Sequence, residues 1–167
     1  MLKLLKRLLA LMLVLLLVPA LADTLDEEDA RLLTVTIGQT DYVLGMSTAQ
    51  DLMNAGWPWN RESDGVYSFY CADYGSYFYA ETLGGSPDAP LTMIDLMWAD
   101  GVPVRYLSVS TSASGATSGS LWDLLSGSFG ASMNEEGTLV ARIPLSDGRV
   151  LSAAAKDSSA RLRLTLR

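Results

Sequence analysis

The sequence predicts an α+β fold of two tandem subdomains, each a short helix packed on an antiparallel sheet of about three to four strands. Two observations lead to this prediction. Short helical patterns occur at residues 47–56 and 118–127, and each begins at a serine and ends at a glycine. Runs that alternate apolar and polar residues, which are typical of half-buried strands, follow each pattern. The same order of elements therefore repeats in both halves of the chain.

The first 22 residues have the three parts of a signal peptide. Three basic residues precede an uninterrupted apolar run at residues 8–18, and the small-residue pattern Ala20-Leu21-Ala22 comes directly after Pro19. The apolar run is short for a membrane span. We therefore predict cleavage after Ala22, a secreted or extracytoplasmic location, and no stable membrane insertion after cleavage. An uncleaved anchor is the alternative.

The rest of the chain divides by composition into four segments. We expect an acidic lead-in at residues 23–30, a first α+β repeat at 31–110, a linker rich in Ser, Gly and Ala at 111–117, and a second α+β repeat at 118–167.

The first repeat begins with a predicted strand at residues 31–37 and a short return strand at 42–44. A helix follows, because Ser47 and Gln50 fit a capping box, and because Gly56 and Pro58 are suited to end it. Trp57 and Trp59 flank Pro58 and should point the same way, so they are predicted to cover the end of this short helix together. The remaining strands of the repeat are predicted at residues 66–72, 76–83, 91–98 and 102–110.

The second repeat has a helix whose leucines form one apolar face, followed by strands at residues 138–144, 150–155 and 161–167. The final strand alternates without exception. Leu162, Leu164 and Leu166 are predicted to point inward, while the intervening residues, which include Arg161 and Arg163, point outward.

Charge and composition exclude several classes of function. Residues 23–167 hold nine basic and nineteen acidic residues, a formal charge of −10, and such a chain repels nucleic acid. One cysteine allows no internal disulfide, and no histidine is present for general-base catalysis or for the usual zinc sites. Carboxylate pairs such as Glu135 with Glu136 are expected by chance in so acidic a chain. The sequence therefore predicts no catalytic residue, no metal and no cofactor.

The tyrosine-rich hairpin is the one positive indication of a binding site. Both faces of a hairpin at residues 66–83 would carry aromatic rings, although an antiparallel sheet needs only one apolar face. The surplus face is either covered by the second repeat or exposed as a binding surface. The candidate partner-binding residues are Tyr67, Tyr70, Tyr74, Tyr77 and Tyr79.

The stretch from Gly45-Met46-Ser47 to Gly56-Trp57-Pro58 resembles the G-M-[ST]-(helix)-G-x-P signature of small secreted bacterial α/β modules. These include the beta-lactamase-inhibitory-protein-like fold and the outer-membrane assembly lipoproteins of the SmpA/OmlA type. The second copy departs from the signature, with Leu121 at the Ser/Thr position and Ser132 at the proline position. The resemblance implies helices packed on an antiparallel sheet and a non-enzymatic binding or assembly function. The lipoprotein cysteine is absent, and no inhibitory residues can be transferred.

Together these features predict a monomeric, non-enzymatic secreted or cell-envelope binding module. A protein partner is favoured, in an inhibitor-like or assembly-like role. The alternative is a small extracellular glycan-binding or carbohydrate-active protein, since tyrosine and tryptophan platforms also suit sugars.

Overall fold

The computed structural model describes residues 25–71, 76–97, 104–106, 109–110, 118–156 and 161–167. Strands predominate in this part of the chain, with 50% of the residues, and helices hold 22%. The helices are α2 (Glu27–Leu33), α3 (Ala49–Asn54) and α4 (Ser118–Phe129), with a short 3-10 turn, η3 (Leu83–Gly85). None of these helices has the length and apolar character that a membrane span requires.

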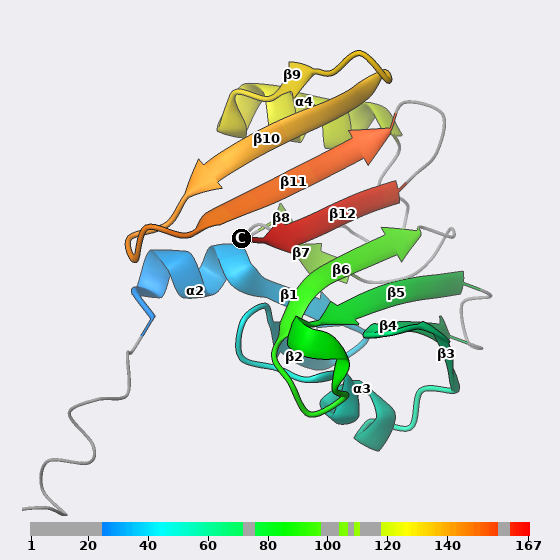
Figure 1. Cartoon of the computed structure of the whole chain (residues 1–167). Helices are drawn as coiled ribbons and strands as arrows, with labels where there is room; N and C mark the ends of the chain where they lie inside the picture. Colours follow the sequence, from blue (N-terminus) through cyan, green and yellow to red (C-terminus); the bar gives the residue numbers. More distant parts are fainter. Residues whose placement is uncertain (1–24, 72–75, 98–103, 107–108, 111–117, 157–160) are drawn as a thin grey trace, which may run out of the picture.

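Eight strands form one large antiparallel sheet, which faces the viewer in Figure 1. It consists of two meanders joined edge to edge, because β12 from the end of the chain pairs with β6 from its middle. In spatial order the strands are β3 (Trp59–Ser63), β4 (Val66–Cys71), β5 (Ser76–Thr82), β6 (Leu91–Met97), β12 (Arg161–Leu166), β11 (Val150–Lys156), β10 (Thr138–Pro144) and β9 (Ser132–Met133).

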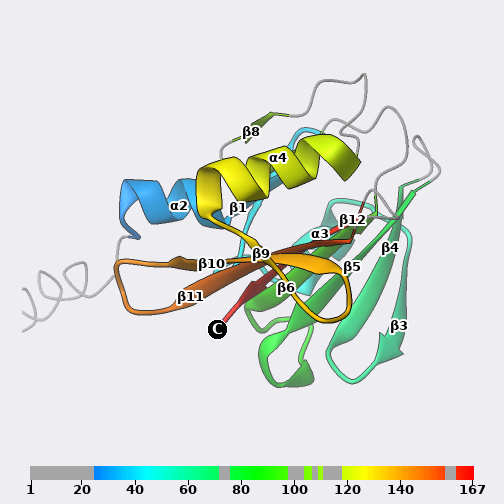
Figure 2. The same cartoon turned by 90° about the horizontal axis from the view of Figure 1, so that it is seen from above.

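A smaller sheet and two helices cover one face of the large sheet. The small sheet has the order β2 (Thr40–Val43), β1 (Thr34–Ile37), β7 (Val104–Tyr106) and β8 (Val109–Ser110). Figure 2 shows β1, β8, α2 and α4 on the same side of the large sheet. The opposite face carries none of the described helices or strands, and we call it the open face.

The predicted division into two α+β subdomains is wrong. The fold is mostly β, and the strands from both halves of the chain share one continuous sheet. The register places Leu162 opposite Leu96 and Leu164 opposite Ile94, so the two halves are paired from Arg161 to Thr165 of β12. Two separate sheets would have left these apolar side chains at exposed edges, whereas all four are buried. The predicted linker at residues 111–117 lies outside the described residues.

The acidic segment before residue 34 is a helix rather than a lead-in followed by a strand. The Asp26 side chain accepts a hydrogen bond from the Glu28 backbone at 2.9 Å and caps α2, whose first turn is acidic, as the helix dipole favours. Asp29 is only 5% exposed and accepts hydrogen bonds from the Ser146 backbone NH at 2.9 Å and hydroxyl at 2.5 Å. This acidic side chain therefore fastens α2 to the turn between β10 and β11.

The predicted helix around residue 50 is confirmed, but its cap lies one residue later than expected. Thr48 accepts a hydrogen bond from the Asp51 backbone at 3.1 Å, and the Asp51 carboxylate accepts one from the Thr48 backbone at 2.8 Å. Ser47 instead accepts a hydrogen bond from the Val43 backbone. Gly56 has φ +88°, a conformation that favours glycine, and follows the end of α3 as predicted.

Trp57 has a packing role, as predicted, but its observed contacts are with strands β2 and β5. Its indole NH donates a hydrogen bond to the Tyr42 hydroxyl at 3.2 Å, and its ring meets Phe78 edge-on, with centroids 5.9 Å apart. Trp59, two residues on, begins the edge strand β3. The prediction that Trp57 and Trp59 together cover the end of the helix is wrong, because Trp59 is exposed. The two tryptophans therefore have different roles, one in packing and one at the rim.

The core lies between the large sheet and the elements that cover it. One row of paired residues crosses all eight strands on the covered face, and its six central side chains are buried. From β3 to β9 the row is Trp59, Phe69, Phe78, Leu96, Leu162, Ala155, Leu139 and Met133. This row fixes which residues of each strand face the opposite way.

Candidate binding face

The next row of paired residues crosses the open face. Its members alternate with those of the core row, as the strand period requires. From β3 to β9 they are Asn60, Ser68, Tyr79, Asp95, Arg163, Ala154, Val140 and Ser132. The row passes from tyrosine on the N-terminal meander to arginine on the C-terminal one, with a carboxylate at the junction.

Three of the five candidate tyrosines share this face. Tyr70 and Tyr77 are directly paired across β4 and β5, their ring centroids are 4.8 Å apart, and Tyr77 is 48% exposed. Tyr79 lies two residues from Tyr77 on the same side of β5 and is half-buried. We call Tyr70, Tyr77 and Tyr79 the tyrosine patch.

The other two candidates are not in this patch. Tyr67 lies on the covered face, is 2% exposed, and donates its hydroxyl hydrogen bond to the Gly85 carbonyl at 3.2 Å. It therefore belongs to the core. Tyr74 lies outside the described residues. The prediction that both faces of the hairpin carry rings is confirmed, because Phe69 and Phe78 stack on the covered face at 5.1 Å.

Asp95 sits at the centre of the open face between two arginines. Arg161 donates to both of its carboxylate oxygens, at 2.7 and 2.5 Å, and Arg163 donates twice to one of them, at 2.9 and 2.7 Å. The Asp95 side chain is 1% exposed, whereas Arg161 and Arg163 are 39% and 51% exposed. The guanidinium groups therefore cover the carboxylate and remain partly in contact with solvent.

The electrostatics of this cluster favour charged arginines. The hydrogen bond to Asp95 raises the pKa of Arg161 above its ordinary value, although partial burial opposes the shift. Two positive charges against one negative charge leave an excess of one positive charge, and each guanidinium keeps N–H groups that Asp95 does not use.

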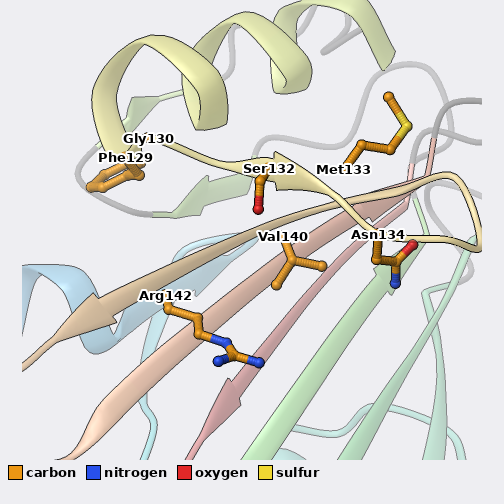
Figure 3. A pocket seen from close by; sticks show the side chains of 7 residues that line it. All are labelled: Phe129, Gly130, Ser132, Met133, Asn134, Val140 and Arg142. Atoms are coloured by element: carbon orange, nitrogen blue, oxygen red, sulfur yellow. The ribbon is translucent and has the colours of Figure 1, made fainter.

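One hollow lies on the C-terminal half of this face, and a second lies at the β9 edge of the sheet. The smaller, of about 160 Å³, is lined by Thr138, Ala154, Arg161 and Arg163. The larger, of about 500 Å³, lies between the end of α4 and strands β9 and β10, and is lined by Phe129, Gly130, Ser132, Met133, Asn134, Val140 and Arg142. Figure 3 shows Ser132, Val140 and Arg142 pointing to the same side, and Met133 pointing away from them.

Arg142 is a further cation on this half of the face. It is exposed, and it forms no ion pair with any residue that the structure describes. We call Arg142, Arg161 and Arg163 the arginine patch. With Asp95 included its formal charge is +2, whereas the whole chain carries −7.

The sequence reasoning did not single out the arginine patch. The alternation in the final strand does place Arg161 and Arg163 outward, which the structure confirms, and that signal could have suggested a cationic surface. Nothing local indicates that Asp95 lies between them, because 66 and 68 residues separate it from the two arginines.

Among the described residues, no group of three or more His, Cys, Asp or Glu side chains is arranged to hold a metal ion. The open face is thus described by hydrogen-bonding arginines, tyrosine rings and shallow hollows. In comparisons with known proteins, the chain matches no family model, no curated protein and no solved structure.

Proposed function

We propose that this protein is a non-enzymatic secreted or cell-envelope binding module that holds a protein partner on its open face. One observation carries the proposal: a single continuous sheet displays a tyrosine patch and an arginine patch side by side, with none of the described elements covering them. Tyrosine and arginine are enriched at protein interfaces and dominate their binding energy, because each combines a large contact area with directional hydrogen bonds.

The dimensions of the face support this assignment. Eight strands spaced about 4.8 Å apart span about 34 Å from the first to the last, and strands of up to seven residues are about 20 Å long. The face is therefore about 700 Å², close to the roughly 800 Å² that one partner contributes to a standard interface. A single bound sugar would occupy only part of this area.

The sequence supports the remaining parts of the proposal. The leader at residues 1–22 directs the chain out of the cytoplasm, and the missing histidine removes the commonest general base. The acidic character of the chain disfavours nucleic acid. In this proposal the protein acts as a monomer, and the partner supplies whatever chemistry follows binding.

Site-specific photo-crosslinking in the producing organism tests this function. A photoreactive phenylalanine analogue replaces Tyr77, which is 48% exposed on the open face. In a matched control it replaces Met46, which is 61% exposed in the turn that follows β2 of the small sheet. The expected result is one discrete protein adduct from position 77 and none from position 46. Tyr79→Ser in the position-77 protein should weaken the adduct several-fold, because Tyr79 lies beside that position.

Two outcomes would reject the proposal. Equal adducts from both positions would indicate unspecific contact. No protein adduct from position 77, together with binding to a glycan array that Tyr79→Ser abolishes, would assign the face to a carbohydrate.

A further inference from the structure

The charge of the open face is unlike that of the rest of the molecule. The arginine patch with Asp95 carries +2 in a chain of −7, so the remainder of the chain carries −9. The net negative charge of the remainder repels an approaching acidic surface, whereas the arginine patch attracts it. Such a contrast favours one orientation of an acidic partner.

The arginines stand at two positions separated by a floor of small and apolar side chains. Val140 pairs with Ala154, which pairs with Arg163, so β10 and β12 lie two strand spacings apart, about 9.6 Å. Arg142 is two residues beyond Val140, about 6.8 Å along β10. The Cα atoms of Arg142 and Arg163 are therefore about 12 Å apart. Arg163 lies in the row that contains Val140 and Ala154, and Arg142 lies in the next row of the same face, opposite Ser152.

An extended peptide matches this spacing. Residues i, i+2 and i+4 of a strand point to the same side, and residues i and i+4 are about 13.6 Å apart. Two carboxylates at i and i+4 would reach the two arginine positions, and a small apolar residue at i+2 would rest on Ser152 and Ala154 of β11, which lie between them. Arginine is suited to this role because its planar fork binds a carboxylate through two hydrogen bonds.

We infer that the arginine patch anchors an acidic, extended segment of the protein partner, with carboxylates four residues apart on the two arginine positions. The inference rests on the proposed function and specifies the chemistry of its partner. It makes Arg142 and Arg163 the specificity-determining residues, while Asp95 holds Arg161 and Arg163 in place.

The test titrates synthetic peptides into the full chain. Binding is measured from the arginine Nε–Hε signals in two-dimensional NMR. The first probe is the acetylated, amidated hexapeptide ETVTET, which has glutamates at i and i+4. The matched probe, EETVTT, has the same composition with adjacent glutamates that point to opposite sides. We expect the Arg142 and Arg163 signals to shift on titration while Arg31, an exposed arginine of α2, does not. The first peptide should bind at least about threefold more tightly than the second.

Two separate arginine variants locate the site, so that the result does not depend on a single substitution that could prevent folding. Arg142→Gln leaves the Asp95 cluster intact and should weaken binding of ETVTET about threefold or more, and Arg163→Gln should do the same. Arg31→Gln is the matched control and should change nothing. If Arg163→Gln fails to fold, Arg142→Gln alone decides the result.

Several results would overturn the inference. Equal affinity for the two peptides, or equal shifts at Arg31, would show that only charge is sensed. Inorganic phosphate that displaces the peptide at equal concentration would indicate a small-anion site. Arginine signals that move with protein concentration alone would identify a second copy as the occupant. None of these results bears on a protein adduct at Tyr77, so the proposed function can stand or fall separately.

Discussion

Asp95→Asn removes the charge that holds two arginines together and should destabilise the fold by about 2 kcal/mol. Because Asn has nearly the same shape as Asp, the substitution leaves almost no cavity, and the loss of stability comes from the lost charge. The wild-type carboxylate is 1% exposed and receives four hydrogen bonds from Arg161 and Arg163. A fully buried pair broken on one side costs about 3–5 kcal/mol. Both arginines are more than a third exposed and recover water, so about 1 kcal/mol for each is the appropriate figure.

Urea unfolding followed by tryptophan fluorescence measures the effect. For a domain of this size, about 2 kcal/mol corresponds to a fall in Tm of about 4–8 °C. The matched control is Asp88→Asn, because Asp88 is exposed and forms no ion pair among the described residues. It should change the free energy of unfolding by less than about 0.5 kcal/mol.

A loss of under about 0.5 kcal/mol for Asp95→Asn would refute the reasoning, since solvated arginines would then not need the carboxylate. A double-mutant cycle with Arg163→Gln isolates the pairwise contribution, which we expect to be about 1 kcal/mol. A coupling energy of zero would show that the arginines cover Asp95 without stabilising it.

Three further predictions concern side chains that accept hydrogen bonds from backbone NH groups: Asp29, Thr48 and Asp147. Asp29→Ala should lower the free energy of unfolding in urea by about 2 kcal/mol, because two hydrogen bonds from Ser146 lose their buried acceptor. An unchanged free energy would mean that Asp29 does not fasten α2 to the turn between β10 and β11. Thr48→Ala should lower the free energy of unfolding in urea by about 1 kcal/mol, because Thr48 caps α3, whereas Gln50→Ala should leave it almost unchanged. Equal losses for the two variants would contradict the observed cap. A backbone NH holds the pKa of Asp147 below its ordinary 3.8, so Asp147→Asn should be the less stable protein near neutral pH. The difference should vanish as the pH falls through that lowered pKa, and a gap that widens in acid would disprove it.

Features with a local cause could be predicted from the sequence. The faces of the strands at residues 91–97 and 161–166 follow from simple alternation, and Ile94, Leu96, Leu162 and Leu164 are buried accordingly. The separation of Tyr70, Tyr77 and Tyr79 from Phe69 and Phe78 follows from the same period. The helix end at Gly56 was also predictable, because a glycine followed closely by Pro58 is a local signal for the end of a helix.

Features with a distant cause were missed. The two subdomains merge because β6 and β12 pair, and no short-range pattern states which strand a given strand will have as its neighbour. In the sequence, Asp95 is indistinguishable from an ordinary outward-facing acid. Its role as the acceptor for Arg161 and Arg163 is seen only when β6 and β12 are paired. Asp29 likewise reads as a solvated charge until Ser146, 117 residues away, is placed against it.

The central position of β12 has a consequence for how the chain reaches its native state. The strand that joins the meanders is synthesised after every other strand of the sheet. Until residues 161–166 are available, the β6 edge has open hydrogen-bonding groups along an apolar strand, which is a template for unwanted pairing with other chains. Contacts between segments so far apart also slow folding. We therefore expect folding to be late and cooperative, with the two meanders joining only once residues 161–166 are available.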